Sequence, residues 1–351
     1  MLLFEYDSLP WLDSMTIFHT LARLGVNALS IVSPNKPFIS IGYFQDAELE
    51  VDFDFCRNAG LPVLRREIGG GAVYLDYNQI FYHVILRRDH PLATLDIDKL
   101  YRVMSEPVIE TYREFGIETK FKEVNDIITV EGRKISGEGA ANIGNAVVFV
   151  GSLILDFDYK TMAHALKVPD EKFRDKIFKT MEENVTTMRR ELGGQLPPRD
   201  ELRKVLIEKF EKLLGPFERA SIDTKLKTRM DEVGKILISK DFLFKRTPRK
   251  PEGVRIRHGV EVLYTAHKAK GGLIRTYQEV QERRLADIAI TGDFTLYPKE
   301  NLDVLDRYLV GSEKVKREIE SRVEEFYEKT NSQTPGVDVD DWVEAVKVLE
   351  E

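Results

Sequence analysis

The stretch Arg65-Arg66-Glu67-Ile68-Gly69-Gly70-Gly71-Ala72-Val73-Tyr74-Leu75-Asp76 places two arginines directly before three glycines and a short apolar run. Arginine carries a planar, permanently charged fork that suits carboxylate and phosphate oxygens. Three consecutive glycines cost backbone entropy and bury no side chain, so they need a reason. Without Cβ atoms, their main-chain N–H groups can touch an anion. The stretch therefore predicts a site for a small anion, or for an acid that becomes a phosphate ester.

A structural explanation of the same stretch stays open. The glycines could form a tight turn between strands, with the arginine pair on the surface. In either case we expect one of the two arginines to form an ion pair with Glu67 or another acid.

The composition limits the classes of protein to which the chain can belong. Its 351 residues suffice for a sizeable core and two domains. Hydrophobic residues make up 42% and charged residues 32%, as in ordinary globular proteins. The net charge of −7 argues against a nucleic-acid-binding protein, which needs a basic face. We therefore expect no nucleic-acid partner.

The single cysteine, Cys56, excludes an internal disulfide and a cysteine cluster for zinc. We expect it to be a buried structural thiol on a helix, in a reducing, cytoplasmic compartment. The first residues lack the basic and apolar regions of a signal peptide, and no apolar run approaches the ~20 residues of a membrane span. We expect no signal peptide and no membrane partner.

Hydrophobic periodicity predicts helices over residues 10–24, 51–59 and 97–114, and a helical, charged segment over 159–214. Short runs rich in β-branched and aromatic residues predict strands at Ala28–Val32, Phe38–Ile41, Ala72–Leu75, Ile80–Leu86, Val124–Val130, Lys134–Ser136 and Ala146–Asp156. This alternation predicts an α+β domain with a mixed, largely antiparallel sheet.

A Pro- and Lys-rich stretch at 245–253 predicts a boundary between a large domain, 1–245, and a small one, 250–351. Beyond it, the pattern predicts a small α+β domain. Its strands would cover 254–264, 271–279 and 286–290, and its helices would follow Pro298 and cover 312–329 and 339–350. We expect Asp340 or Asp341 to cap the last helix.

A second group of polar residues joins Asn125-Asp126 to Arg133-Lys134-Ile135-Ser136-Gly137. A lysine at a strand, followed by Ser-Gly, offers a point charge, a hydroxyl and a flexible turn, and lysine is a common phosphate ligand. A solvated turn lysine is the alternative. We expect His83, in an apolar strand, to be a core residue, and Asp293 to stabilise a turn of the small domain.

The combined pattern R-R-x-x-G-G-G-A-V-x-x-D, followed by N-D and R-K-I-S-G, resembles the lipoate–protein ligase A family of the biotin/lipoyl ligase superfamily. The resemblance covers nearly the whole chain, because it also includes Ile41 to Gln45, residues 51–62, Gly151 to Ile154, Asn184 to Thr186 and residues 254–350.

This resemblance implies a biotin/lipoyl ligase-like catalytic domain over 1–245 that forms an acyl-adenylate, and an accessory domain over 250–351. It implies an AMP-forming ligase that activates lipoate or octanoate with ATP and Mg²⁺. The acyl group would pass to a lysine of a lipoyl carrier domain, on the E2 subunit of a 2-oxoacid dehydrogenase or on the glycine cleavage H protein.

The resemblance also implies roles for individual residues. Lys134 would be catalytic and would stabilise charge between the carboxylate and the α-phosphate. Substrate and nucleotide binding would fall to Arg66, Gly69, Gly70, Gly71, Ala72, Val73, Asp76, Asn125, Asp126, Ser136, Gly137 and Gly151. Val73 and Ile41 would line an apolar tunnel for the acyl tail. Asp126 and Glu138 are candidate metal ligands.

The chain departs from the family pattern at four places. Leu75 replaces a histidine, Asn78-Gln79 replaces Gly-Asn, Glu138 replaces a small neutral residue, and Phe149-Val150 replaces a histidine pair. Two alternatives stay open. One is an ATP-independent octanoyl or lipoyl transferase, whose known examples use a cysteine, and the other is a ligand-binding pseudoenzyme of the same fold. A biotin ligase is disfavoured, since its Gly-Arg-Gly-Arg loop is absent.

Overall fold

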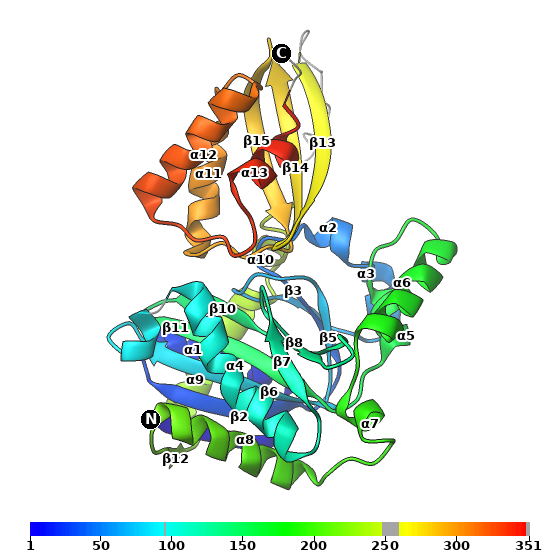
Figure 1. Cartoon of the computed structure of the whole chain (residues 1–351), viewed down its shortest axis with the longest axis vertical. Coiled ribbons are helices and arrows are strands. Elements are labelled where there is room, and N and C mark those ends of the chain that lie inside the picture. Colours follow the sequence, from blue (N-terminus) through cyan, green and yellow to red (C-terminus); the bar gives the residue numbers. More distant parts are fainter. Residues whose placement is uncertain (95, 248–259, 349–351) are drawn as a thin grey trace.

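The computed structural model describes residues 1–94, 96–247 and 260–348 (Figure 1). Residues up to 247 form the lower body in Figure 1, and residues 260–348 form the upper body. The predicted boundary at 245–253 and the beginning of the strand predicted at 254–264 lie largely outside the described residues.

The lower body is built around a twisted sheet in the order β10-β11-β6-β2-β1-β12. Most neighbours in it are antiparallel, whereas β1 pairs in parallel with both β2 and β12. The prediction of an α+β fold with a largely antiparallel sheet is therefore confirmed. The strands are β1 (Leu2–Leu9), β2 (Ala28–Pro34), β6 (Gln79–Arg87), β10 (Gly139–Ile143), β11 (Ala146–Ile154) and β12 (Glu218–Ala220).

Helices cover both faces of this sheet. Helices α4 (Ile97–Glu114) and α8 (Arg199–Leu214) pack on one face, and α1 (Trp11–Leu24) and α9 (Thr224–Leu237) pack on the other. Each face has its own hydrophobic core, because alternate strand residues point to opposite sides. Helix α1 ends as predicted at Gly25, which adopts the left-handed conformation with φ of 63°.

Two small sheets carry the stretches that the sequence singles out. One has the order β4-β3-β5, made of β3 (Phe38–Ile41), β4 (Val63–Arg65) and β5 (Val73–Leu75). The glycines lie between β4 and β5. The other has the order β7-β8-β9, made of β7 (Thr119–Lys122), β8 (Asp126–Thr129) and β9 (Lys134–Gly137).

The remaining helices of the lower body are short, apart from α6. They are α2 (Ala47–Glu50), α3 (Phe53–Asn58), η1 (Pro91–Thr94), α5 (Tyr159–Ala165), α6 (Glu171–Asn184), α7 (Met188–Glu191) and α10 (Lys240–Leu243). The charged segment predicted over 159–214 is helical, and α6 within it buries no residue fully.

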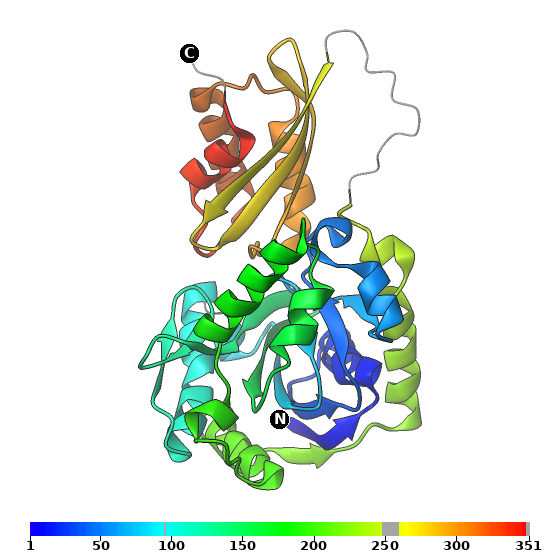
Figure 2. The same ribbon diagram turned by 90° about the vertical axis from the view of Figure 1, so that its right-hand side faces the viewer.

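The upper body pairs an antiparallel sheet with helices on one of its faces (Figures 1 and 2). Its elements are β13 (Val260–Ala269), β14 (Gly272–Gln281), β15 (Arg284–Gly292), η2 (Lys299–Asn301), α11 (Leu302–Leu309), α12 (Lys316–Thr330) and α13 (Val339–Val346). The cap predicted for α13 was wrong: Asp338 is the N-cap, and Asp341 completes a capping box from the third helical position.

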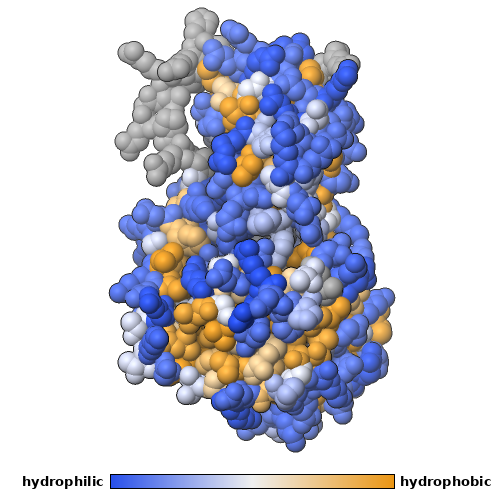
Figure 3. Space-filling view, turned by 90° about the vertical axis from the view of Figure 1, so that its left-hand side faces the viewer, coloured by the Kyte–Doolittle hydropathy of each residue, from blue (hydrophilic) through white to orange (hydrophobic). Residues whose placement is uncertain are grey.

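Figure 3 shows mainly hydrophilic side chains over the upper body on the face it presents, whereas hydrophobic residues gather on the lower body. Within residues 1–94, 96–247 and 260–348, no helix is both long and apolar enough to span a bilayer.

Candidate active site

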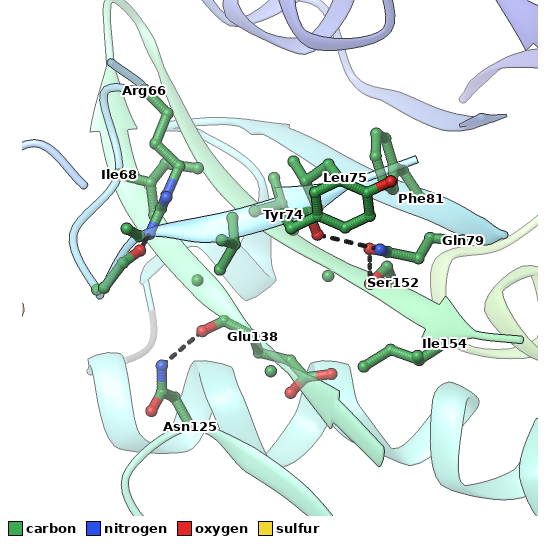
Figure 4. A pocket seen from close by; sticks show the side chains of 18 of the residues that line it. Arg66, Ile68, Tyr74, Leu75, Gln79, Phe81, Asn125, Glu138, Ser152 and Ile154 are labelled. Carbon is green, nitrogen blue, oxygen red and sulfur yellow. Dashed lines mark hydrogen bonds between the residues drawn. The ribbon is translucent and has the colours of Figure 1, made fainter. Parts of the chain in front are cut away.

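A cavity of about 310 Å³ lies between the glycine stretch and strands β6 and β11 (Figure 4). Figure 4 shows Arg66 and Ile68 at one side of it and Gln79, Phe81 and Ile154 at the other, with Asn125 and Glu138 below. Most of the residues singled out from the sequence line it: Arg66, Gly69, Gly70, Gly71, Ala72, Val73, Asn125, Lys134, Gly137 and Gly151. The structure thus brings both predicted polar groups to one cavity.

Four residues predicted from the sequence are absent from the described lining: Ile41, Asp76, Asp126 and Ser136. Ile41, the last residue of β3, is completely buried in the core, so its predicted place in the tunnel was wrong. Asp76 caps the following turn, where the Asn78 main chain donates to it at 2.9 Å. Asp126 pairs with Lys134 and Ser136 hydrogen-bonds to Glu138, so both contact residues that line the cavity.

Arg66 shapes the loop formed by residues 66–71, here called the glycine loop. Its guanidinium donates to the main-chain carbonyls of Ser40 (2.9 Å), Gly69 (2.8 Å) and Gly71 (2.8 Å). Burial lowers the pKa of Arg66 to about 10, so the group stays charged at neutral pH. Arg66 therefore holds the carbonyl groups of Gly69 and Gly71. The main-chain N–H groups of the loop are left to bind other partners.

Arg65 also binds main chain and forms no ion pair among the described residues. Its guanidinium donates to the carbonyls of Gly42 (2.9 Å), Tyr43 (2.8 Å) and Phe242 (2.8 Å). Glu67 instead pairs with Arg23 from α1, and its other oxygen lies 3.8 Å from Lys299 of the upper body. The prediction that one of the two arginines pairs with an acid was wrong, because both satisfy buried carbonyls.

Three nearby glycines have different reasons to lack a side chain. A Cβ on Gly42 would overlap the carbonyl oxygen of Gly70, and a Cβ on Gly69 would come within 2.7 Å of the Phe294 carbonyl oxygen. Gly70 adopts a left-handed φ of 88°. At Gly71, by contrast, a Cβ would meet no described atom closer than 3.9 Å. Close approach of a ligand is thus the remaining reason for glycine at position 71.

Lys134 reaches the cavity from the first residue of β9. Its Nζ lies 2.6 Å from Asp126 Oδ1 on the paired strand β8, and its side chain is 39% exposed. A Cβ on Gly137 would come within 2.6 Å of Nζ, so glycine there gives the lysine its space. The ammonium group is therefore held at the cavity wall by one carboxylate and remains open to solvent.

Glu138 brings a second carboxyl group to the same wall. Its Oε1 accepts hydrogen bonds from Tyr82 and from Ser136 Oγ (2.8 Å), and its Oε2 is buried with no partner among the described residues. Burial raises the pKa of Glu138 to about 7, against the lowering effect of Tyr82, Ser136 and Lys134. Near neutral pH this carboxyl can therefore be protonated or ionised.

Asn125, Ser136 and Gly151 support this wall. Asn125 Nδ2 donates to the Glu138 carbonyl at 2.6 Å, and the Asn125 carbonyl accepts from the Glu138 N–H at 2.8 Å. Ser136 Oγ also lies 2.8 Å from the Ser152 carbonyl, which it can use as an alternative acceptor. A Cβ on Gly151 would overlap the Tyr82 ring, so packing explains that glycine.

The side of the cavity formed by β6 and β11, here called the apolar floor, contains residues that were not predicted from the sequence to belong to the site. Alternate residues of β6 (Gln79, Phe81 and His83) and of β11 (Val150, Ser152 and Ile154) face the cavity. Helix α1 adds Met15 and Phe18, and the segment after β11 adds Phe157, Met162, Met181 and Val185. The apolar run of β6 predicted a strand, but it does not reveal which face of a fully buried strand lines a cavity.

Among the described residues, no group of three or more His, Cys, Asp or Glu side chains is placed to hold a metal ion. Asp126 is already paired with Lys134, and Glu138 is hydrogen-bonded and buried. These two carboxyl groups do not form a site made for a resident metal ion, which usually needs several oxygen ligands from the protein.

Residues 15–211 match the family described as the lipoyl protein ligase A/B catalytic domain. The chain belongs to the lipoyl protein ligase A/B family. Lipoate-protein ligase A subunit 1 of Thermoplasma acidophilum is 34% identical over 185 residues, 50% of this chain and 68% of that protein. The lipoate–protein ligase of Streptococcus pyogenes is 27% identical over 290 residues, 81% of this chain and 79% of that protein.

The same family includes transferases. Octanoyltransferase LipM of Kyrpidia tusciae is 28% identical over 202 residues, 52% of this chain and 73% of that protein. The chain is therefore a member of an enzyme family that contains both lipoate ligases and octanoyltransferases.

Solved structures support the family fold. The Thermoplasma acidophilum structure described as a bi-partite lipoate protein ligase and its E2 lipoyl domain has a TM-score of 0.61 and 28% identity, over 71% of this chain and 98% of that one. Plasmodium falciparum LipL1 in complex with lipoate has a TM-score of 0.68 over 98% of both chains, at 16% identity. The second likeness shows that the fold is shared along the upper body as well.

Proposed function

We propose that this lipoyl protein ligase A/B family member is an ATP-dependent lipoate–protein ligase. It activates lipoate or octanoate as acyl-AMP and transfers the acyl group to a lysine of a lipoyl carrier domain. The observation that carries the proposal is the position of the chain's one cysteine, which is buried in α3 and is absent from the described lining of the cavity.

A transferase that passes the acyl group through a cysteine needs an accessible thiolate beside the acyl site. The Cys56 side chain is 1% exposed and packs in the core around β3. Burial raises the pKa of the Cys56 thiol to about 11. A thiol in this environment does not supply a nucleophile at neutral pH, which disfavours the transferase alternative despite the LipM relatives.

The residues around the cavity suit acid activation. A carboxylate attacks the α-phosphorus of ATP, the bond to the bridging oxygen breaks, and pyrophosphate leaves. Negative charge then develops where an ammonium group and main-chain N–H groups can stabilise it. Lys134 supplies the ammonium, and the glycine loop, held by Arg66, supplies N–H groups near the unobstructed Gly71. In the second step the carrier lysine amine attacks the acyl carbon and AMP leaves.

Mg²⁺ enters this proposal as the counterion of the ATP triphosphate, because the described carboxylates do not form a resident metal site. For the carrier, the E2 lipoyl domain named with the Thermoplasma acidophilum ligase supports an E2 subunit, and a glycine cleavage H protein is the other candidate. We further propose that residues 1–245 form the catalytic domain and 250–351 an accessory domain, and that the enzyme works in the cytoplasm.

The direct test is a ligation assay with lipoate, ATP, Mg²⁺ and a purified lipoyl carrier domain, followed by carrier mass and AMP release. We expect one lipoyl group per carrier and one AMP per lipoyl group. A parallel reaction replaces lipoate and ATP with octanoyl-acyl carrier protein. If the carrier is acylated as well in that reaction as with lipoate and ATP, the protein is a transferase and the ligase proposal is wrong.

Lys134→Ala tests the proposed catalytic residue. We expect AMP formation to fall at least about a hundredfold, because electrostatic stabilisation of the developing charge is lost. Lipoate binding, measured by calorimetry, should survive because the apolar floor is unchanged. Lys209→Ala, which removes an ion pair with Glu114 away from the described lining, is the matched control. Near-normal turnover in Lys134→Ala would remove this lysine from the catalytic role.

A ligand-binding pseudoenzyme is the second candidate, and the ion pair between Lys134 and Asp126 favours it. Because Asp126 neutralises the ammonium group, activation could be weak unless a substrate displaces the carboxylate. Tight lipoate binding with no AMP release in the ligation assay would support this candidate.

A further inference from the structure

The apolar end of the cavity has a defined boundary. On β6 and β11, three cross-strand pairs face the cavity: Gln79 with Ile154, Phe81 with Ser152, and His83 with Val150. The next pair on the same face, Ile85 with Val148, is completely buried in the core beneath α1. The cavity therefore ends at the pair of His83 and Val150.

The side chains around the His83 end of the cavity are mostly apolar and include aromatic rings and the thioether of Met15. Met15 and Phe18 of α1 also line the cavity, and the centroid of the His83 ring lies 4.6 Å from that of Phe18 and 6.0 Å from that of Phe81. Aromatic rings and a thioether make favourable contacts with sulfur. An acyl chain whose far end carries sulfur suits this environment better than a plain methyl group.

His83 is the polar exception at this end. Its Nδ1 lies 3.4 Å from Ser30 Oγ on the neighbouring strand β2, and this is the one hydrogen bond that the His83 side chain makes with the described residues, so Nε2 makes none. The imidazole is neutral, because burial and, to a smaller extent, His19 together lower the pKa of His83 to about 3. When the Ser30 hydroxyl donates to Nδ1, the proton resides on Nε2 and can be donated to a ligand.

We propose that His83 is a specificity-determining residue whose Nε2–H contacts the sulfur-bearing end of the acyl chain, so that this site prefers lipoate to octanoate. The proposal rests on the proposed function, since it assumes that the cavity holds the acyl group. Octanoate places a methyl group at this end and leaves the N–H without a partner. An N–H group in the cavity lining whose hydrogen bond is unmade disfavours such an analogue.

The test measures binding of lipoate and of octanoate to the full chain by calorimetry, with neither ATP nor carrier present. We expect wild type to bind lipoate about fivefold more tightly, the effect of one modest hydrogen bond. His83→Leu should reduce this ratio to about one, chiefly by improving octanoate binding. His83→Gln, which keeps an N–H donor, should retain part of the preference.

Val150→Ala is the matched control, because it changes the volume of the same cross-strand pair without touching a polar atom. It should weaken both acids by a similar factor. Thermal melting checks that each variant is folded, and if His83→Leu does not fold, the ratio in His83→Gln relative to Val150→Ala decides. The proposal is wrong if the lipoate-to-octanoate ratio is unchanged in the His83 variants. It is also wrong if wild type binds both acids equally or binds neither acid.

This test separates the two claims. A ratio that depends on His83, together with a negative ligation assay, would keep His83 as the determinant and reject the ligase. A positive ligation assay with a ratio independent of His83 would do the reverse.

Discussion

Glu138 carries a buried carboxyl group whose charged form is unfavourable in the folded protein. Its carboxyl group lies under the cavity wall with one oxygen bound by Tyr82 and Ser136 and the other without a partner among the described residues. A buried polar atom with no partner costs free energy, and the cost grows when the group is charged. The neutral form of Glu138 is therefore the one that the folded protein accommodates.

This conflict predicts a pH-dependent stability. Burial raises the pKa of Glu138 from 4.5 to about 7. Between these values the folded state binds a proton that the unfolded state releases, so the free energy of unfolding falls as pH rises through this window. The loss is complete above about pH 7 and amounts to about 3 kcal/mol.

We therefore expect Glu138→Gln to be more stable than wild type at pH 8.5, by up to about 3 kcal/mol, and similar to it at pH 4.5. Urea unfolding at the two pH values measures the difference. Glu324→Gln, on the exposed side of α12, is the control and should change little at either pH. A Glu138→Gln effect that is the same at both values would show that titration of this carboxyl is not the cause.

At the same scale, the sequence identified residues better than their roles. Arg66 and the three glycines were predicted to touch an anion, and they do line the cavity. However, the Arg66 guanidinium donates hydrogen bonds to the main-chain carbonyls of Ser40, Gly69 and Gly71. A side chain's partner depends on segments that converge only in the folded chain, so a local pattern cannot distinguish a carbonyl acceptor from a ligand oxygen.

Among the elements, the glycine loop combines structural and functional constraints, and substitutions can separate them. Gly42→Ala would push a Cβ into the Gly70 carbonyl, whereas the Cβ in Gly71→Ala meets no described atom closer than 3.9 Å. We expect Gly42→Ala to lower the free energy of unfolding by about 2 kcal/mol or more, as overpacking does. Gly71→Ala should change it by less than about 0.5 kcal/mol.

Activity should separate the same two variants. If a ligand approaches the Gly71 main chain, Gly71→Ala raises the KM for ATP severalfold although the protein is as stable as wild type. Urea unfolding and ATP-dependent lipoylation of a carrier measure the two effects. Unchanged kinetics in Gly71→Ala would show that the ligand does not need a bare main chain there.

Predictions of whole elements succeeded where the periodicity was strong. Helices α1 and α4 and strands β6 and β11 lie close to their predicted ranges, because each buries a regular apolar face. Strands β1, β7 and β10 were not predicted. β10 (Gly139–Ile143) is short and rich in small residues. It forms a strand because it pairs with β11. Pairing across the sheet, which supplies such a strand's stability, has no local signature.

The arrangement of the whole molecule depends on contacts that the sequence did not reveal. Phe44, from the lower body, belongs to the core of the upper body and stacks on Phe294, with ring centroids 5.2 Å apart. The Gly292 N–H donates to the Phe44 carbonyl at 3.0 Å, and the Gly70 N–H to the Phe294 carbonyl at 3.4 Å. The upper body thus rests directly on the glycine loop. Residues some 250 positions apart share no periodicity, so only the folded chain shows this contact.

Lys299 is one of the charged residues that join the two bodies, together with Arg246, which pairs with Asp303 and Asp306, and Arg275, which pairs with Glu50. The Lys299 side chain is 7% exposed, its Nζ donates to the Asn142 carbonyl at 2.8 Å, and it lies 3.8 Å from Glu67 beside the glycine loop. Because a buried ammonium group with several partners holds both bodies, its removal leaves the Asn142 carbonyl and part of the Glu67 charge unpaired.

We expect Lys299→Met to loosen the two bodies without unfolding either. Amide hydrogen exchange should accelerate at Gly70 and Gly292, whose N–H groups bridge the bodies, by about tenfold or more, while strands β6 and β14 keep their protection. Lys316→Met, which removes an exposed ion pair with Glu320 and Asp340 in the upper body, is the matched control and should leave both amides unchanged. If exchange at Gly70 and Gly292 stays at the wild-type rate in Lys299→Met, the buried charge of Lys299 is dispensable to the contact between the bodies.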